Sequence, residues 1–254
     1  MKKTDELSIQ STALFAKDCY RDKQTRLGED LYAHCKSVAR QAEQIAHKFY
    51  CDLRADKLPE NHHEIIAAIV HCGFLHDVLN VSSCAFEHIA ESTNVQVAAM
   101  VAALSRDFRL IETKRDVEFR GRLSQSSVSA QIVAVADVIC TASEARRVLE
   151  AHGVSKASLV KKIVAQLDGD LMAVHAAQKY YVLRLYVHAA RNIIGDIGKA
   201  IKVCKQDAKM EKLALHTTKK LRESQELDPP KMAARSKARP AQKRKSRASK
   251  TKRS

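Results

Sequence analysis

An adjacent histidine and aspartate, His76 and Asp77, close a strongly apolar stretch over residues 65–75. Two ionisable side chains in such a setting cost considerable free energy unless something pairs with them. A divalent metal ion satisfies both, because neutral imidazole and carboxylate are good ligands for manganese, iron, zinc or cobalt. Two adjacent ligands do not complete a site, so other histidines and carboxylates on apolar helices become candidates.

Two further residues meet that description. His34 lies near the start of an amphipathic pattern over residues 31–49, and Asp137 lies inside the apolar run 132–139, where a lone carboxylate is out of place. The candidate metal ligands are therefore His34, His76, Asp77 and Asp137.

The segments that carry these residues are helical in pattern nearly throughout. Glycine (7) and proline (4) are scarce, which argues against a β-sandwich or barrel. Apolar residues recur at helical spacing, and the sequence predicts an all-α, multi-helix bundle. The predicted helices cover 31–49, 62–75, 86–92, 95–105, 106–122, 128–148, 155–166 and 171–204.

Two local features refine this pattern. Asn61 with Glu64 three residues later predicts a capping box at the start of the apolar helix. Gly195 and Gly198 predict possible interruptions in the last long helical region.

The charge of +15 is unevenly distributed along the chain. Residues 231–254 contain eleven Lys or Arg and no acid, which leaves +4 for residues 1–230. One helical domain is predicted over 8–226, followed by a basic tail over 227–254 that is too polar to form a core and is expected to be disordered. Such a tail binds polyanions such as RNA, DNA or an anionic membrane surface, or serves only as a solubilising extension, or as an import signal if the organism has nuclei.

The remaining composition points to a soluble cytoplasmic protein. No apolar run reaches about 18 residues, so no transmembrane segment is predicted, and the first residues do not lead into an apolar signal region. The seven cysteines form no CxxC pair and are expected to be reduced thiols. GxGxxG, Walker A and GxSxG motifs are absent, which removes the common dinucleotide, P-loop and nucleophilic-serine interpretations.

Several segments resemble one known family. QTRLG at 24–28 stands six residues before His34, and LHDV at 75–78 contains the adjacent pair. AQIVAVAD at 130–137 ends in the last candidate ligand, and ALFA at 13–16 is similar to the family's opening helix. The order His, His-Asp, Asp on a helical scaffold resembles the HD-domain phosphohydrolase superfamily, and specifically the RelA/SpoT-type domain that removes pyrophosphate from the 3′ position of (p)ppGpp.

This resemblance implies a function for particular residues. His34, His76, Asp77 and Asp137 would hold one divalent ion, with manganese expected, and the substrate would be a nucleotide. Arg26 resembles the residue that packs on the guanine base, and Lys23 would contact phosphate. A surface arginine in solvent is the alternative for Arg26.

The chain departs from the family pattern beside the metal motif. The usual HDxxED acids are replaced by Asn80 and Val81, and Thr141 replaces a later asparagine. Asn80 can orient a water molecule but cannot take its proton, so Asp77 and Asn80 are the expected catalytic pair. The open alternatives are another phosphate substrate, slow (p)ppGpp hydrolysis, or a non-catalytic nucleotide sensor or nucleic-acid-associated adaptor.

Other ionisable residues have simpler interpretations. His71 lies about 140° around the helix from His76 and is expected to be a buried, hydrogen-bonded histidine. His62 and His63 are expected in an exposed first turn. The arginines of 106–122 are expected on a solvated face, with a phosphate-facing wall as the alternative. The last long helices are expected to pack in the core, with a homodimer interface as the alternative.

Overall fold

The computed structural model describes residues 3–226, and within that range it contains helices and no strand. The all-α prediction is therefore confirmed. Residues 227–254 lie outside the described residues, so the disorder and polyanion binding expected of the basic tail remain predictions.

The helices follow one another through short connections. The first half contains α1 (Lys3–Cys19), α2 (Leu31–Cys51), a short 3-10 helix (Ala55–Lys57), α3 (His62–Leu75), α4 (Val78–Val81), α5 (Phe86–Ser92) and α6 (Val95–Leu104). The second half contains α7 (Glu112–Gln125), α8 (Val128–His152), α9 (Val154–Met172), α10 (Ala176–Lys179) and α11 (Tyr181–Glu226).

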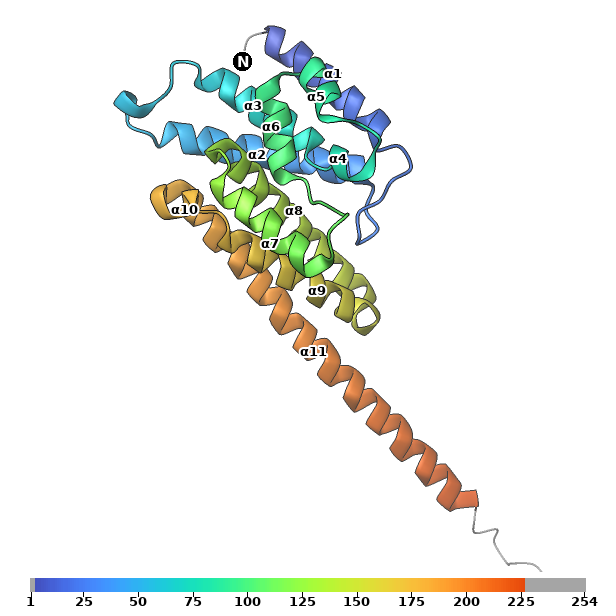
Figure 1. Ribbon diagram of the computed structural model, residues 1–254. Coiled ribbons are helices and arrows are strands. Elements are labelled where there is room, and N and C mark those ends of the chain that lie inside the picture. The colour runs from blue at the N-terminus through green and yellow to red at the C-terminus, as the bar shows by residue number, and fades with distance from the viewer. Residues whose placement is uncertain (1–2, 227–254) are drawn as a thin grey trace, which may run out of the picture. The chain divides into compact units, whose positions relative to one another are not determined.

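Helices α2, α3 and α8 form the centre of the bundle (Figure 1). α2 packs against both α3 and α8, α1 and α6 cover α3, and α9 lies along α8. Gly73 permits the close approach of α3 to α2, because a Cβ atom there would lie 2.5 Å from the Cα of Ala39. This crossing brings the start of α2 and the end of α3, which carry His34 and His76, to the same place.

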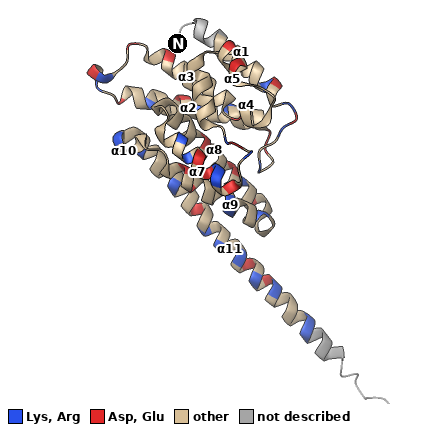
Figure 2. Cartoon of the chain, viewed as in Figure 1, with Lys and Arg blue, Asp and Glu red and all other residues tan. Residues whose placement is uncertain are grey.

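Charge follows the layering of the bundle. α3 and α6 carry almost no charged residues, whereas α7 carries both signs along its length (Figure 2). Two segments, His62–Val81 and Val128–His152, are apolar and long enough to cross a membrane, but 67% of the most apolar 18-residue window of each is buried inside the bundle. They are core helices of the bundle.

Two local predictions are wrong. α11 runs through Gly195 and Gly198 without a break, and the real interruption lies between Met172 and Tyr181. Ile194 and Ile197 are buried beside the glycines, and this packing outweighs the cost of about 1 kcal/mol for each glycine in a helix. Asn61 is the N-cap residue of α3, as predicted, but its side chain makes no capping bond there, so the capping box is not formed.

The chain divides into two compact units. The first covers residues 1–209 and contains every residue discussed below, and the second covers residues 210–254. α11 contributes to both units. Its buried residues, from Val182 to Ile201, belong to the first unit.

Candidate metal centre and adjoining cavity

Four helix positions bring the predicted ligands together. His34 lies in the first turn of α2, which begins after Asp30, whose carboxylate accepts a hydrogen bond of 2.8 Å from the backbone N–H of Ala33. His76 is the residue at which α3 ends, and Asp77 precedes α4. Asp137 lies within α8.

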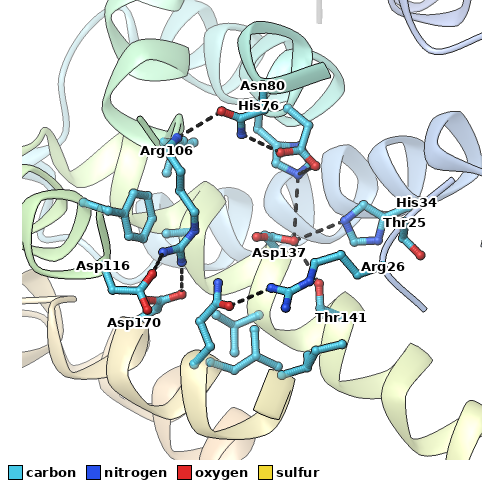
Figure 3. Close-up of a pocket in the computed structure, with 18 of the residues that line it drawn as sticks. Thr25, Arg26, His34, His76, Asn80, Arg106, Asp116, Asp137, Thr141 and Asp170 are labelled. Atoms are coloured by element: carbon cyan, nitrogen blue, oxygen red, sulfur yellow. Dashed lines mark hydrogen bonds and ion pairs between the residues drawn. The ribbon is translucent and has the colours of Figure 1, made fainter. Parts of the chain in front are cut away.

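The side chains of His34, His76 and Asp137 converge on one point (Figure 3). Asp137 is at the centre, since its Oδ1 lies 3.2 Å from Nε2 of His34 and 3.8 Å from Nε2 of His76. Oδ2 of Asp77 also lies close to His76, at 3.6 Å from its Nε2. Both imidazoles are buried, and Asp137 opens onto a cavity.

The donor set fits a divalent ion. Nε2 of His76 is buried and makes no hydrogen bond within residues 3–226, while Nδ1 of the same ring is 2.9 Å from the carbonyl oxygen of Gly73. Nδ1 keeps its proton for Gly73, so Nε2 is the ring atom that would release its proton to bind an ion. Ligand bonds of about 2.0–2.1 Å place neighbouring ligand atoms roughly 3–3.5 Å apart, close to the spacings seen here. His34, His76 and Asp77 also offer ligand atoms that lie within 4.8 Å of one another.

The charges of this group support one another. Partial burial would raise the pKa of Asp137, but the hydrogen bond with His34 and the nearby His76 hold that pKa well below its usual range. Burial would lower the pKa of His76, while Cys35 and the carboxylates of Asp77 and Asp137 raise it to about 10. Asp137 is thus kept ionised, as a metal ligand must be.

A further carboxylate, that of the buried Glu144, lies beside the imidazole of His34 on its Nδ1 side. Its Oε2 has no hydrogen-bond partner within the described chain and lies 3.9 Å from Nδ1 of His34. Its other oxygen accepts bonds from the hydroxyl of Thr25 and, at 3.3 Å, from the backbone N–H of Glu29. Carboxylates in this position orient a ligating imidazole. Glu144 was not among the residues predicted from the sequence. Its position two helical turns after Asp137, in an apolar helix, would have marked it as a candidate on the same helix face.

Asn80 holds the adjacent ligand in place. Its amide nitrogen donates to Oδ1 of Asp77 at 2.9 Å, and its carbonyl oxygen accepts from the backbone N–H of Arg106 at 3.0 Å. Both bonds are shown in Figure 3. Asn80 therefore positions Asp77 and also lines the cavity. Val81, at the other altered position of the HDxxED pattern, lines the cavity without offering a polar side chain.

The two predicted substrate residues are placed differently. Arg26 lines the cavity, and its guanidinium donates to Oε1 of Gln166 at 2.9 Å. The ammonium group of Lys23 instead donates to the backbone carbonyl of Val81, and Lys23 is not among the lining residues. The structure thus places Arg26, but not Lys23, at the cavity that the four predicted ligands also line.

The arginines of 106–122 do not form a solvated face. Arg106 is 14% exposed, donates to Asp116 at 2.6 Å and to Asp170, and lies 3.9 Å above the ring centre of Phe119. Arg120 also donates to Asp170, and Arg122 donates to the backbone carbonyls of Ala102 in α6 and of Ser105 just after it. Of this group, Arg109 is exposed as expected. The solvated interpretation fails because two acids, one of them on α9, draw Arg106 and Arg120 inward.

The four predicted ligands, His34, His76, Asp77 and Asp137, are called the metal-ligand group below. They lie at one side of a cavity of about 530 Å³, which we call the main cavity. Its walls come from the loop at 24–27 and from α2, α4 and α6 to α9. This volume is typical of small-molecule sites.

The remaining histidines and cysteines agree with their simpler interpretations. His71 is buried, and its Nδ1 is 2.8 Å from the hydroxyl of Thr12. His62 and His63 begin α3 and belong to neither of the two ligand clusters found in the described part of the chain. The cysteines are free thiols.

Comparison with known proteins identifies the fold. No protein-family model and no characterised protein matches the sequence. A solved structure described as a metazoan ortholog of SpoT that hydrolyses ppGpp matches with a TM-score of 0.51 and 12% identity, over 72% of this chain and 93% of that chain. The chain therefore shares the fold of that structure, in agreement with the fold that the sequence resemblance predicted.

Proposed function

We propose that this protein is a metal-dependent phosphohydrolase that acts on a nucleotide. The observation that carries the proposal is the convergence of His34, His76, Asp77 and Asp137, with the buried Nε2 of His76 left without a hydrogen-bond partner. Manganese is the ion we expect. A divalent ion bound there supplies a Lewis acid for the phosphoryl group and lowers the pKa of bound water.

The residues around the ligands have separate tasks. Glu144 and the Gly73 carbonyl fix the orientation of the two imidazoles, and Asn80 fixes Asp77. Thr141 donates its hydroxyl to Oδ1 of Asp137 at 3.1 Å. Asn80 and Val81 stand where the HDxxED pattern has its final two acids, and neither side chain is a carboxylate. Asn80 can therefore orient the attacking water but cannot deprotonate it.

The substrate suggested by the resemblance is (p)ppGpp. The similar metazoan structure belongs to a protein described as hydrolysing ppGpp, which supports a phosphorylated nucleotide as the substrate class. Arg26 at the cavity wall is the residue of this chain that we expect to contact the nucleotide.

A second function is favoured by the bonding of Asn80. Its amide nitrogen and its carbonyl oxygen each already make one bond, to Asp77 and to the backbone of Arg106, and an amide cannot take a proton from water. A nucleotide sensor that retains the metal site without the chemistry is consistent with that arrangement. The expected cytoplasmic location, homodimerisation and the polyanion partner of residues 231–254 remain predictions.

The test is release of phosphate and pyrophosphate from a nucleotide panel that includes ppGpp, with manganese added to the full chain. Release that disappears in Asp77→Ala supports the hydrolase. Binding of the ion without release from any nucleotide would contradict the hydrolase and support the sensor.

A further inference from the structure

We infer that the main cavity takes a phosphate monoester with one phosphate group on an uncharged, partly apolar body, and not a nucleotide with two diphosphate groups. This inference rests on the proposed function, because it assumes that the phosphate lies at the metal-ligand group. It narrows the substrate class of that same site, and it replaces (p)ppGpp, the substrate that the resemblance suggests, with a monophosphate.

The balance of charge in the main cavity is the first argument. Six carboxyl groups line it, against three guanidinium groups and no lysine. The carboxyl groups belong to Asp77, Glu112, Asp116, Asp137, Glu144 and Asp170. A divalent ion offsets two of these charges, and the cavity still carries no excess positive charge with which to attract a ligand of several negative charges.

The state of the arginines is the second argument. Arg106 projects from the wall opposite the ligands, but Asp116 and Asp170 both accept its hydrogen bonds, and Phe119 covers one face of its guanidinium (Figure 3). Two carboxylates already offset its charge, so a phosphate group approaching it would meet their negative charge as well. Arg106 therefore does not act as a second phosphate site.

Two cations remain to meet a phosphate. Among the described residues, neither Arg26 nor Arg115 forms an ion pair with a carboxylate: Arg26 bonds to the neutral Gln166, and Arg115 lies 4.7 Å from the ring centre of Phe108. A guanidinium pairs with a phosphate through two parallel hydrogen bonds. Two such groups and the metal ligands are sufficient for one phosphate, whereas two diphosphate groups need more.

The apolar part of the cavity is the third argument. Between α6, α7, α8 and α9 the wall is formed by aliphatic and aromatic side chains from all four helices. They include Leu104, Phe119, Leu123, Val138, Ile163 and Leu167. A charged group placed there would lose its hydration without gaining a partner, while an uncharged apolar body would be stabilised.

The experiment compares GMP with ppGpp, which share guanosine and differ in their phosphates. Binding of each nucleotide to the full chain is measured by equilibrium dialysis, with and without manganese, and guanosine serves as the phosphate-free reference. We expect GMP to bind about tenfold more tightly than ppGpp or better, a difference of about 1.4 kcal/mol. We also expect GMP to bind more tightly than guanosine.

A pair of variants ties the preference to the cavity. Asp116→Asn removes one negative charge from the cavity wall and frees part of Arg106, so the affinity for ppGpp should rise relative to that for GMP. Glu118→Gln makes the same kind of change two residues further along α7, outside the main cavity, and should leave the ratio unchanged. An unchanged ratio in Asp116→Asn would contradict the charge argument.

Failure of this inference and failure of the proposed function give different results. Tighter binding of ppGpp than of GMP, or no binding of GMP at millimolar concentration, would overturn the inference. Preferred binding of GMP without metal-dependent release of phosphate would leave the inference standing and overturn the hydrolase.

Discussion

Buried ionisable groups lack partners on one side of the main cavity and are paired with one another on the other side. On the side of α2, α3 and α8, Nε2 of His76 and Oε2 of Glu144 are buried and have no hydrogen-bond partner among residues 3–226. On the side of α7 and α9, Arg106 is bonded to both Asp116 and Asp170. The first side requires a further group to satisfy it, and the second is satisfied by the protein itself.

This difference separates a binding site from a structural ion pair. Buried polar atoms without partners are rare in native proteins. Nε2 of His76 lies 3.6 Å from Asp77 and 3.8 Å from Asp137, the spacing expected of ligands around one ion. A closed network of charges stabilises the packing of helices and leaves little for a ligand. The predictions below test this distinction, from the largest expected effect to the smallest.

Asp170→Ala should have the largest effect of the series, a decrease in the free energy of unfolding. The substitution leaves Arg106, which is 14% exposed, with one acid fewer and removes the partner of Arg120. Breaking a buried pair from one side costs about 3–5 kcal/mol, so the free energy of unfolding in urea should fall by that order. Manganese affinity should stay within a few-fold of that of the unmodified protein.

The control is Asp107→Ala, which removes the acid of the exposed pair with Arg109. Its unfolding curve should nearly coincide with that of the unmodified protein. Equal stability of Asp170→Ala would show that the opposite wall does not stabilise the fold.

Asp137→Ala should have the next largest effect, on metal binding. Asp137 contacts both imidazoles, so its loss removes the centre of the ligand group. We expect manganese affinity, measured by isothermal titration calorimetry, to fall about 100-fold or more, which corresponds to about 2.7 kcal/mol. Glu150→Ala, an exposed acid on the same helix paired with Arg146, should bind manganese normally.

Glu144→Gln should weaken metal binding to a smaller extent. Glutamine can still accept the hydrogen bond from Thr25, but it removes the charge that faces Nδ1 of His34. Loss of such a supporting carboxylate lowers metal affinity about 10- to 100-fold. A role limited to packing would instead lower the melting temperature of the metal-free protein and leave the affinity unchanged.

Asn80→Ala should have the smallest effect of the series. It removes one hydrogen bond to Asp77, a side chain that is 31% exposed, and one from the backbone of Arg106. A contribution of about 1 kcal/mol corresponds to a roughly fivefold loss of manganese affinity. If hydrolysis is observed, a larger fall in kcat than in metal affinity would show that Asn80 also orients water.

The sequence was sufficient to predict the all-α fold and the residues of the ligand group. His34, His76, Asp77 and Asp137 were identifiable because each is an ionisable residue in or beside a helix that packs in the core, and the structure brings all four together. Their role as metal ligands remains a prediction. The fold followed from helical periodicity, which tertiary packing reinforces.

Features that depend on distant pairing were not predictable. Asp170 lies 64 residues from Arg106, so nothing local showed that the arginine-rich segment would turn inward. Lys23 was expected at the substrate, but the carbonyl of Val81, 58 residues away, holds its ammonium group. The helix continues through Gly195 because buried neighbours outweigh its low helix propensity.

The most direct test of the account is the metal content of the purified full chain. The protein is loaded with manganese, passed through a desalting column and analysed by mass spectrometry for metals, beside Asp137→Ala and Asp116→Asn. The account predicts one ion per chain in the unmodified protein and in Asp116→Asn, and almost none in Asp137→Ala. An unmodified protein without bound metal, or equal metal content in Asp137→Ala, would contradict the central claim that these four residues form a metal centre.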